Sequence, residues 1–344
     1  MQINGTQYRS LWFEDDCLCM IDQNKLPFEF SIVRLESYQQ VAEAIRQMTV
    51  RGAPAIGAAG AYGLALAARE APEASFRSFI REARDLLAST RPTAIDLYNA
   101  LETVYDEVLK FIPNYEHARQ VALLSAEEFA RDSAAECLAL GEHGASLIED
   151  GDRILTHCNA GALATVDWGT ALSSIRIAHR QGKKIFVYVD ETRPRFQGAR
   201  LTAFELEQEG IPHAIITDAA AGYFFWKKEI DLVIVGADRI CLNGDIANKI
   251  GTFEKAVLAK EHKVPFWVAA PLSTFDLNCP CGEKIPIEYR DEAEIKQYGG
   301  LALCNPGSAA LNPGFDITPA QYITGIITPK GVFLPKEASQ KVQI

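Results

Sequence analysis

The chain has 344 residues, a length that suggests about two domains and a sizeable hydrophobic core. Its 34 Lys and Arg residues against 45 Asp and Glu residues leave a net charge of −11. Nucleic acids and anionic membranes are bound by clustered basic side chains, so this charge argues against both as partners. Hydrophobic residues make up 48% and charged residues 23%, which is typical of a folded globular protein and argues against extensive disorder.

The cysteines and the N-terminal residues indicate in which cellular compartment the protein is expected. No stretch reaches the ~18 uninterrupted apolar residues of a membrane helix, and the N-terminus lacks the basic start and apolar run of a signal peptide. Eight cysteines over this length are too sparse for a disulfide framework, so we expect free thiols in a reducing cytoplasm. The pairs Cys17/Cys19 and Cys279/Cys281 are spaced more closely than zinc ligands usually are, so we expect no structural metal.

The first half of the chain reads as a small sheet followed by helices. Up to about Leu35, short β-prone runs alternate with turn formers, which predicts an antiparallel meander. From Ser37, a candidate helix cap, apolar residues recur at three- and four-residue spacing. Pro54 falls near the first turn of an Ala- and Gly-rich helix that reaches about Ala68. Later helices are expected over 76–87, 94–111 and 118–147.

After Asp150, short apolar runs alternate with longer amphipathic segments. Strands are expected at 153–156, 185–189, 214–216, 232–235 and 265–269, and helices at 167–180, 199–208, 219–226 and 249–262. Strands that are apolar throughout and alternate with helices predict an α/β domain with a parallel sheet covered on both faces. We expect two domains, residues 1–125 and residues 126–344. Ligands of such sheets bind outside the carboxyl ends of the strands, so chemistry is expected just after each strand.

The first of these strands leads into Cys158. A cysteine on a Gly- and Ala-rich strand-to-helix turn faces a helix N-terminus, where the macrodipole and the free N–H groups favour a thiolate and bind anions. A packed, inert cysteine on a tight turn fits the position equally well.

The loop after the second strand is rich in charge and contains Asp190, Glu191, Arg193, Arg195, Gln197 and Arg200. Such a loop either binds a ligand or forms an internal ion-pair network. We expect Asp190 and Glu191 to hold some of the arginines. Gln197, beside Gly198 at the helix entrance, is the better candidate for touching a ligand.

A third strand end carries Asp238. It falls just past the wholly apolar run 232–235, where desolvation would raise its pKa and let it carry a proton near neutral pH. Asn248 and Lys249 are expected to enter the next helix, with an amide and an ammonium suited to hydroxyls or phosphate. The alternatives are a helix cap for Asp238 and a solvated surface charge for Lys249.

In the helical half, Arg51, Gly52 and Ala53 precede a helix start. Small residues leave the N–H groups of a helix N-terminus accessible, and with a guanidinium they form a phosphate cradle. The motif is neither a dinucleotide-binding nor a Walker loop, so nucleotide binding is not indicated. Arg91, at a break between helices, is a second phosphate candidate. The series Gly57, Gly60 and Gly63 is more typical of close helix packing than of a ligand site.

Ordered motifs over most of the chain are the basis of a family resemblance. They are residues 51–57 (RGAPAIG), 90–93 (TRPT), 157–161 (HCNAG), 190–198 (DETRPRFQG), 236–239 (GADR), 248–252 (NKIGT), 285–288 (IPIE) and 312–319 (NPGFDITP). As a set they resemble the methylthioribose-1-phosphate isomerase family, within the initiation-factor-2B alpha/beta/delta-like group. That family isomerises 5-methylthioribose 1-phosphate to 5-methylthioribulose 1-phosphate in methionine salvage. The same fold includes isomerases of 5-deoxyribose 1-phosphate and ribose 1,5-bisphosphate, and regulatory subunits without isomerase activity.

The resemblance implies a mainly helical N-terminal domain with a small antiparallel β portion, a Rossmann-like C-terminal domain and a homodimer. It implies that Cys158 and Asp238 are the catalytic groups. The substrate contacts that it implies are Arg51, Gly52, Ala53, Arg91, Gln197, Asn248 and Lys249. One departure is Gly314, where the family usually has alanine, within a long segment 304–315. That segment and the unusual stretch 275–281 could lie beside the C5 substituent of the sugar, so the alternative is a sister isomerase of another pentose 1-phosphate.

The chemistry of an aldose 1-phosphate limits what the protein must supply. The anomeric carbon is locked as a phosphate ester, so an acid must protonate the ring oxygen, and Asp238 is the candidate. Hydrogen then moves from C2 to C1, either as a proton taken by a Cys158 thiolate or as a hydride in a dry site, and the sequence leaves both routes open. Neither route needs nicotinamide, flavin or metal, so no cofactor is expected. A non-catalytic regulatory subunit is less favoured, because it would have no reason to hold both residues.

Overall fold

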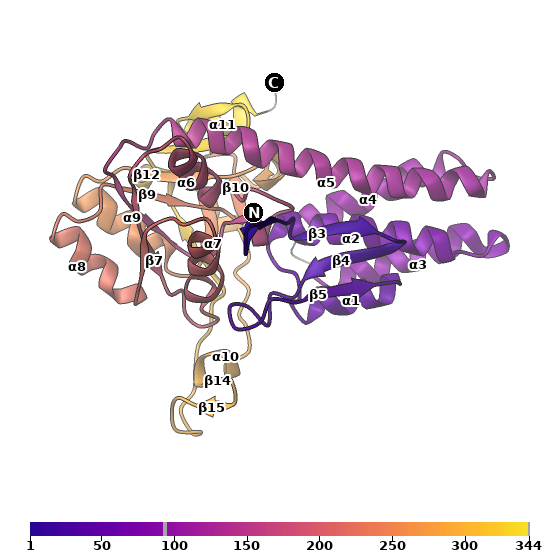
Figure 1. Ribbon diagram of the computed structural model, residues 1–344, viewed down its shortest axis with the longest axis horizontal. Coiled ribbons are helices and arrows are strands. Elements are labelled where there is room, and N and C mark those ends of the chain that lie inside the picture. Colours follow the sequence, from indigo (N-terminus) through magenta and orange to yellow (C-terminus); the bar gives the residue numbers. More distant parts are fainter. Residues whose placement is uncertain (92–94, 343–344) are drawn as a thin grey trace. The chain divides into compact units, whose positions relative to one another are not determined.

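The computed structural model of the chain describes residues 1–91 and 95–342 (Figure 1). The backbone divides into two compact units. Unit 1 comprises Met1–Leu138 and Gly161–Gly169, and unit 2 comprises Ala139–Ala160 and Thr170–Ile344. The boundary expected at residues 125 and 126 falls inside the long helix α5 (Tyr115–Ala145), which carries the chain from unit 1 into unit 2.

Unit 1 begins with the antiparallel sheet that the alternation of β-prone runs and turns predicts. Its strands are β3 (Leu11–Glu14), β4 (Cys17–Ile21) and β5 (Ile32–Leu35), with β4 in the centre and wholly buried. A short hairpin, β1 (Gln2–Ile3) with β2 (Thr6–Gln7), precedes it. The predicted meander is confirmed.

The helices of unit 1 are α1 (Tyr38–Arg46), α2 (Ala53–Glu70), α3 (Phe76–Ser89), α4 (Ile95–Leu109) and the first part of α5. Ser37 caps α1 in a reciprocal capping box with Gln40, which is the role expected from its position. Helix α2 is buried along almost its whole length. A Cβ added at Gly60 would lie 2.4 Å from the Leu97 side chain of α4, so the glycines of α2 serve close helix packing, as predicted.

Unit 2 is built on a seven-stranded sheet of order β18-β17-β12-β9-β6-β7-β8. The strands are β6 (Arg153–Thr156), β7 (Phe186–Asp190), β8 (His213–Ile216), β9 (Leu232–Val235), β12 (Phe266–Ala269), β17 (Gly325–Thr328) and β18 (Gly331–Phe333). All neighbours pair in parallel except β17 with β18. The helices between strands are α6 (Ala171–Arg180), α7 (Ala203–Gln208), α8 (Ala221–Trp226) and α9 (Thr252–Glu261), and α11 (Pro335–Lys341) follows. The predicted parallel α/β sheet is confirmed.

A second, four-stranded sheet was not foreseen. It has the order β13-β10-β11-β16, with β10 (Arg239–Cys241), β11 (Ile246–Lys249), β13 (Phe275–Asp276) and β16 (Phe315–Thr318). The expectation that Asn248 and Lys249 enter a helix is wrong, because they pair with Asp316 and Phe315 of β16, and α9 begins at Thr252. A partner strand so distant in sequence leaves no local signal at residues 246–249.

Between these elements unit 2 carries an excursion that we call the arm, residues 289–313. A bridge between Tyr289 and Pro313 closes its base. It contains α10 (Ala293–Lys296) and the hairpin β14 (Gln297–Tyr298) with β15 (Leu301–Ala302), which is exposed throughout. Figure 1 shows these elements away from the sheet of their own unit. In the part of the chain that the structure describes, no helix is both long and apolar enough to cross a membrane.

Candidate active site

Three neighbouring strands of unit 2 end at the same edge of the sheet. In the register Thr156 lies opposite Val189 and Leu155 opposite Val233, so β6 lies between β7 and β9. Cys158 follows β6, Gln197 follows β7 and Asp238 follows β9. A Cβ added at Gly236 would lie 3.0 Å from the Cβ of Ala160, so the stretches that carry Asp238 and Cys158 touch. The prediction that these strands end at one edge of the sheet is therefore confirmed.

Cys158 is held in an unusual backbone conformation. Its φ of +64° is left-handed, which costs a non-glycine residue about 1–2 kcal/mol. Thr192, itself at φ +64°, accepts a hydrogen bond from the Cys158 N–H at 2.9 Å, and Thr202 donates to the Cys158 carbonyl at 2.7 Å. Strain of this kind persists where the surroundings impose it, and it concentrates at functional sites. These contacts argue against the reading of Cys158 as an ordinary packed thiol.

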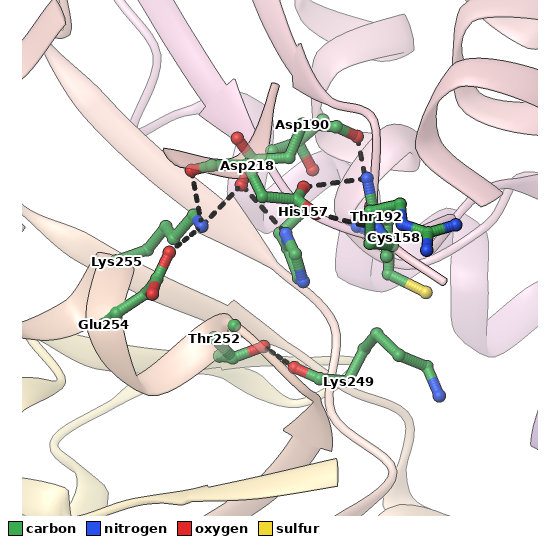
Figure 2. A network of polar contacts seen from close by, with 12 residues as sticks. His157, Cys158, Asp190, Thr192, Asp218, Lys249, Thr252, Glu254 and Lys255 are labelled. Carbon is green, nitrogen blue, oxygen red and sulfur yellow. Dashed lines mark hydrogen bonds and ion pairs between the residues drawn. The ribbon is translucent and has the colours of Figure 1, made fainter. Parts of the chain in front are cut away.

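The prediction that Cys158 faces a helix N-terminus is wrong. The chain after it forms a 3-10 turn over Ala162–Ala164, and α6 begins only at Ala171. The intervening Gly161–Gly169 is closed by its own bridge and belongs to unit 1. The Cys158 side chain is half-buried, and its sulfur points away from the His157 ring (Figure 2).

A buried ion network lies beside this turn (Figure 2). His157 Nδ1 lies 2.8 Å from Asp190 Oδ2, and Lys255 Nζ lies 3.6 Å from the same oxygen. All three side chains are at most 1% exposed. Burial raises the pKa of Asp190, while His157 and Lys255 oppose that rise. The expectation that Asp190 would hold an arginine is therefore wrong, because a histidine and a lysine from other elements neutralise it.

His157, Asp190 and Asp218 are the group in the described chain whose ligand atoms come close enough to hold a metal ion. The ligand atoms His157 Nδ1, His157 Nε2 and Asp190 Oδ2 are already engaged. Both carboxylate oxygens of Asp218 accept backbone N–H groups, from Thr192 at 2.8 Å and from Arg193 at 2.7 Å. The ammonium of Lys255 supplies the positive charge. The donor set therefore fits a protonated network better than a metal.

Gln197 lies at the entrance of the π-helical turn Gly198–Thr202. A Cβ at Gly198 would lie 1.7 Å from the Asp190 carbonyl, so only glycine allows the turn to approach the end of β7. The side-chain oxygen of Gln197 is buried and has no hydrogen-bond partner among the described residues. A buried acceptor without a donor is costly, and a ligand hydroxyl would satisfy it.

Two arginines of this loop, Arg193 and Arg195, contact the arm. Arg193 donates to the Ile295 carbonyl at 3.0 Å, and Arg195 pairs with Glu294 at 3.1 Å. The rings of Phe196 and Tyr298 meet edge to face with centroids 4.7 Å apart. Arg193 and Arg195 thus bind a segment about a hundred residues later, while the charge of Arg193 also acts on Glu191 within the loop.

Asp238 lies at the start of the β10–β11 hairpin. Its backbone N–H donates to the Ala247 carbonyl at 2.9 Å, so it sits beside the strand that carries Asn248 and Lys249. The expectation that Asp238 is desolvated is wrong for this chain, because its side chain is exposed. The apolar run of β9 is buried, but its influence does not reach three residues beyond its end.

Asn248 and Lys249 occupy different environments on β11. Asn248 is buried and donates to the Thr252 hydroxyl at 3.0 Å. Lys249 is half-buried, donates to the Gly314 carbonyl at 2.9 Å and lies 4.3 Å from the centroid of the Phe315 ring. Lys249 is therefore not the freely solvated surface charge of the alternative reading. Its ammonium and the thiol of Cys158 extend in the same direction in Figure 2.

The remaining predicted contacts belong to unit 1. Gly52, at φ +94°, is the N-cap of α2, and no side chain caps that helix. Ala53 is its first residue, and Pro54 occupies the first turn as expected. Arg51 and Arg91 are half-buried, and the other residues of the 90–93 motif that follow Arg91 lie outside the described residues. The structure is compatible with an anion at the N-terminus of α2, and the binding roles of these four residues stay predictions.

Comparison with known proteins identifies the family to which this fold and these motifs belong. A model of the initiation factor 2 subunit family matches residues 49–335. The chain belongs to the initiation factor 2 subunit family. A curated member from Roseiflexus castenholzii, named methylthioribose-1-phosphate isomerase, is 49% identical over 339 residues, which are 96% of each chain.

Solved structures of the family carry two kinds of name. The crystal structure of 5-methylthioribose 1-phosphate isomerase from Pyrococcus horikoshii matches with a TM-score of 0.93 and 41% identity, covering 98% of this chain and 96% of that one. The crystal structure named translation initiation factor eIF-2B subunit delta, from A. fulgidus, matches with a TM-score of 0.89 and 42% identity, covering 98% and 100%. Family membership by itself therefore leaves open whether a member is an isomerase or a regulatory subunit.

Sequence reasoning missed three residues of this site. They are His157, Thr192 and Lys255. Lys255 follows Glu254 in an amphipathic helix, where a buried lysine looks like any surface one. The signal that could have drawn attention to His157 is its place directly after a predicted strand end and directly before the candidate thiol.

Proposed function

We propose that the chain is an isomerase that converts 5-methylthioribose 1-phosphate to 5-methylthioribulose 1-phosphate in methionine salvage. The observation that carries the proposal is the strained turn of Cys158, held by Thr192 and Thr202 beside the stretch that leads to Asp238. The curated relatives that cover nearly the whole chain bear the name of this enzyme. A regulatory subunit would have no use for a half-buried thiol fixed in this way.

Ring opening is the first chemical step. The carboxylic acid of Asp238 gives its proton to the ring oxygen of the sugar, and the bond between that oxygen and C1 breaks. The carboxyl is exposed in the free chain, so bound substrate has to exclude water from it. Asp238 then holds a carboxylate that can take the proton leaving the C2 hydroxyl, which returns the acid for the next turnover.

Hydrogen transfer from C2 to C1 is the second step, and two routes fit the site. In the first, a Cys158 thiolate removes the C2 proton and returns it to C1 through an enediol-type intermediate whose C1 oxygen still carries the phosphate. In the second, hydride passes directly from C2 to C1, and the thiolate stabilises the positive charge that develops at C1. Reaction in deuterated water separates them, because exchange of solvent deuterium into C1 contradicts the hydride route and full retention of a C2 label contradicts the proton route.

Substrate binding is assigned as follows. The side-chain oxygen of Gln197, which has no partner among the described residues, accepts a sugar hydroxyl. Asn248 and Lys249 contact hydroxyl or phosphate groups from β11. From unit 1, the residues Arg51, Gly52, Ala53 and Arg91 bind phosphate or sugar, with the two arginines as the charged partners of the phosphate.

The test is a turnover assay of purified protein with three substrates: methylthioribose 1-phosphate, 5-deoxyribose 1-phosphate and ribose 1-phosphate. We expect kcat/KM to be highest for methylthioribose 1-phosphate, by about 10- to 200-fold, because an apolar C5 group contributes about 1–3 kcal/mol in a matching pocket. A preference for 5-deoxyribose 1-phosphate would establish the sister isomerase. Absence of turnover with all three would favour the regulatory subunit.

We also propose a cytoplasmic location and a homodimer. The location rests on the eight cysteines, which are all free thiols. The dimer rests on the family resemblance, and the mass of the protein in solution, measured by light scattering, tests it.

A further inference from the structure

The histidine beside the candidate thiol touches two different parts of unit 2. Its Nδ1 lies 2.8 Å from Asp190 Oδ2, at the end of β7. Its Nε2 lies 2.8 Å from the carbonyl oxygen of Ile250, the residue that directly follows Asn248 and Lys249 of β11. A Cβ at Gly251 would lie 3.0 Å from the His157 ring, so the backbone turn after β11 rests directly on the imidazole.

These contacts determine where the ring carries its protons. A carbonyl oxygen can only accept, so Nε2 must carry a proton and donate it to Ile250. A second proton lies between Nδ1 and Asp190 Oδ2, and Lys255 Nζ lies 3.6 Å from the same oxygen. Because Nε2 already donates to the protein, His157 is not available as a base for the substrate. The role of His157 must therefore come from the two chain stretches that its ring connects.

The imidazole connects the two chain stretches on which the proposed chemistry depends. On one side, His157 is covalently joined to Cys158. On the other, it holds the turn Ile250–Gly251, which is also held by Asp316 through a hydrogen bond of 2.7 Å to the Gly251 N–H. That turn ends the strand of Asn248 and Lys249. A shift of the turn would move these side chains relative to the thiol, and misplacement by about 1 Å can cost on the order of 100-fold in rate.

We propose that His157 is a positioning residue: its Nε2–H···O bond to Ile250 holds the substrate-binding strand β11 in register with the Cys158 turn. This inference rests on the proposed function, because it assumes that Asn248 and Lys249 bind the sugar phosphate. In this proposal substrate binding depends on the bond to Ile250 rather than on the bond to Asp190, and this dependence distinguishes it from a purely structural role.

Two substitutions separate the two bonds. The amide nitrogen of His157→Asn can take the place of Nδ1 and donate to Asp190, but it does not reach Ile250. The amide nitrogen of His157→Gln can take the place of Nε2 and donate to Ile250. We expect H157N to raise the KM for methylthioribose 1-phosphate at least tenfold, and H157Q to stay within threefold of the unmodified protein. The alkylation rate of Cys158 by iodoacetamide, followed by mass spectrometry of its peptide, should change little in either variant.

Several outcomes would overturn the proposal. A KM of H157N within twofold of the unmodified protein would do so, and so would an equal rise of KM in both variants. A fall in thermal stability with KM unchanged in the folded fraction would show a structural role alone. If the unmodified protein turns over none of the three sugar phosphates, the proposed function fails instead, and the kinetic comparison does not apply.

A measurement on the unmodified protein tests the inference even if the protein turns over none of the three sugar phosphates, or if a variant fails to fold. Of the six histidines, all in the described part of the chain, His157 is the buried one. Nitrogen-15 spectra of histidine-labelled protein should therefore show one ring protected from solvent exchange, with a proton on Nε2 above pH 7. A protected ring protonated only on Nδ1 would contradict the bond to Ile250 and overturn the inference.

Discussion

The backbone N–H of Cys158 donates to the Thr192 hydroxyl at 2.9 Å, although both residues are in the left-handed region at φ +64°. The same hydroxyl donates to the Asp190 carbonyl at 3.0 Å, and the Thr192 N–H is itself held by Asp218. Thr192 is thus fixed by the half-buried carboxylate of Asp218 and in turn holds the backbone of Cys158. The conformation of the turn that carries the Cys158 thiol therefore depends on the loop after β7 as much as on the sequence of the turn itself.

Substitution Thr192→Val should loosen this turn. It keeps the shape of the side chain but leaves the Cys158 N–H without its acceptor, which costs about 1–3 kcal/mol. We expect the free energy of unfolding in urea to fall by that amount and kcat to fall more than tenfold. The matched control is Thr103→Val, which removes an exposed hydroxyl bonded to the Asn99 carbonyl on α4. If T192V retains full kcat, the turn does not depend on this hydrogen bond.

Substitutions Cys158→Ser and Asp238→Asn should abolish most of the turnover without unfolding the chain. Loss of an acid or base in such a step lowers kcat about 100- to 10,000-fold. Neither side chain is fully buried, so thermal unfolding should change by only a few degrees. Cys304→Ser, which alters an exposed thiol on the arm, is the control and should leave kcat unchanged. Unaltered activity in both C158S and D238N would remove the catalytic assignment.

Gly52→Ala should destabilise unit 1 more than a similar change elsewhere. The added Cβ would lie 2.3 Å from the carbonyl oxygen of Ala164, within the same unit. Gly182 has a comparable φ of +90° but nothing within 4 Å of an added Cβ. Both alanine variants incur left-handed strain, and G52A adds overpacking of about 1–3 kcal/mol. Equal unfolding temperatures for the two variants would contradict the close approach to Ala164.

Glu294 should make the stability of the arm depend on acid. Burial alone would raise its pKa, but hydrogen bonds and ion pairs with Arg290 and Arg195 outweigh that effect and lower the pKa to about 2. A lowered folded pKa stabilises the fold above the ordinary pKa of ~4.3 and loses that contribution as the pH falls toward 2. The contribution is about 3 kcal/mol at most, from a shift of about two units.

The measurement is the difference in thermal unfolding between the unmodified protein and Glu294→Gln from pH 7 to pH 2. We expect the difference to be constant down to about pH 5 and then to shrink. The control is Glu292→Gln, because Glu292 pairs with Lys296 at 2.7 Å but is exposed. A difference that does not shrink in acid would show that the charge of Glu294 does not stabilise the arm.

The parallel sheet could be predicted because its strands are apolar on both faces, and apolar runs such as 232–235 stand out in any sequence. Cys158, Gln197 and Asp238 followed from the rule that ligands bind beyond strand ends. The β11–β16 pairing could not be predicted, since it joins residues more than sixty positions apart. The left-handed turn at Cys158 was equally hidden, because its cause is the hydroxyl of Thr192 on another crossover.

The arm is fastened at its base and exposed at its tip. Asn312 bonds to the Asp291 carbonyl at 2.9 Å and to Glu294 at 3.2 Å, whereas the hairpin beyond them contacts water on most sides. Residues can therefore be inserted or deleted between Tyr298 and Leu311 without disturbing any strand of the main sheet. Evolution is free to vary the length of this tip, so divergence in length here should say little about whether two relatives share the same catalytic chemistry.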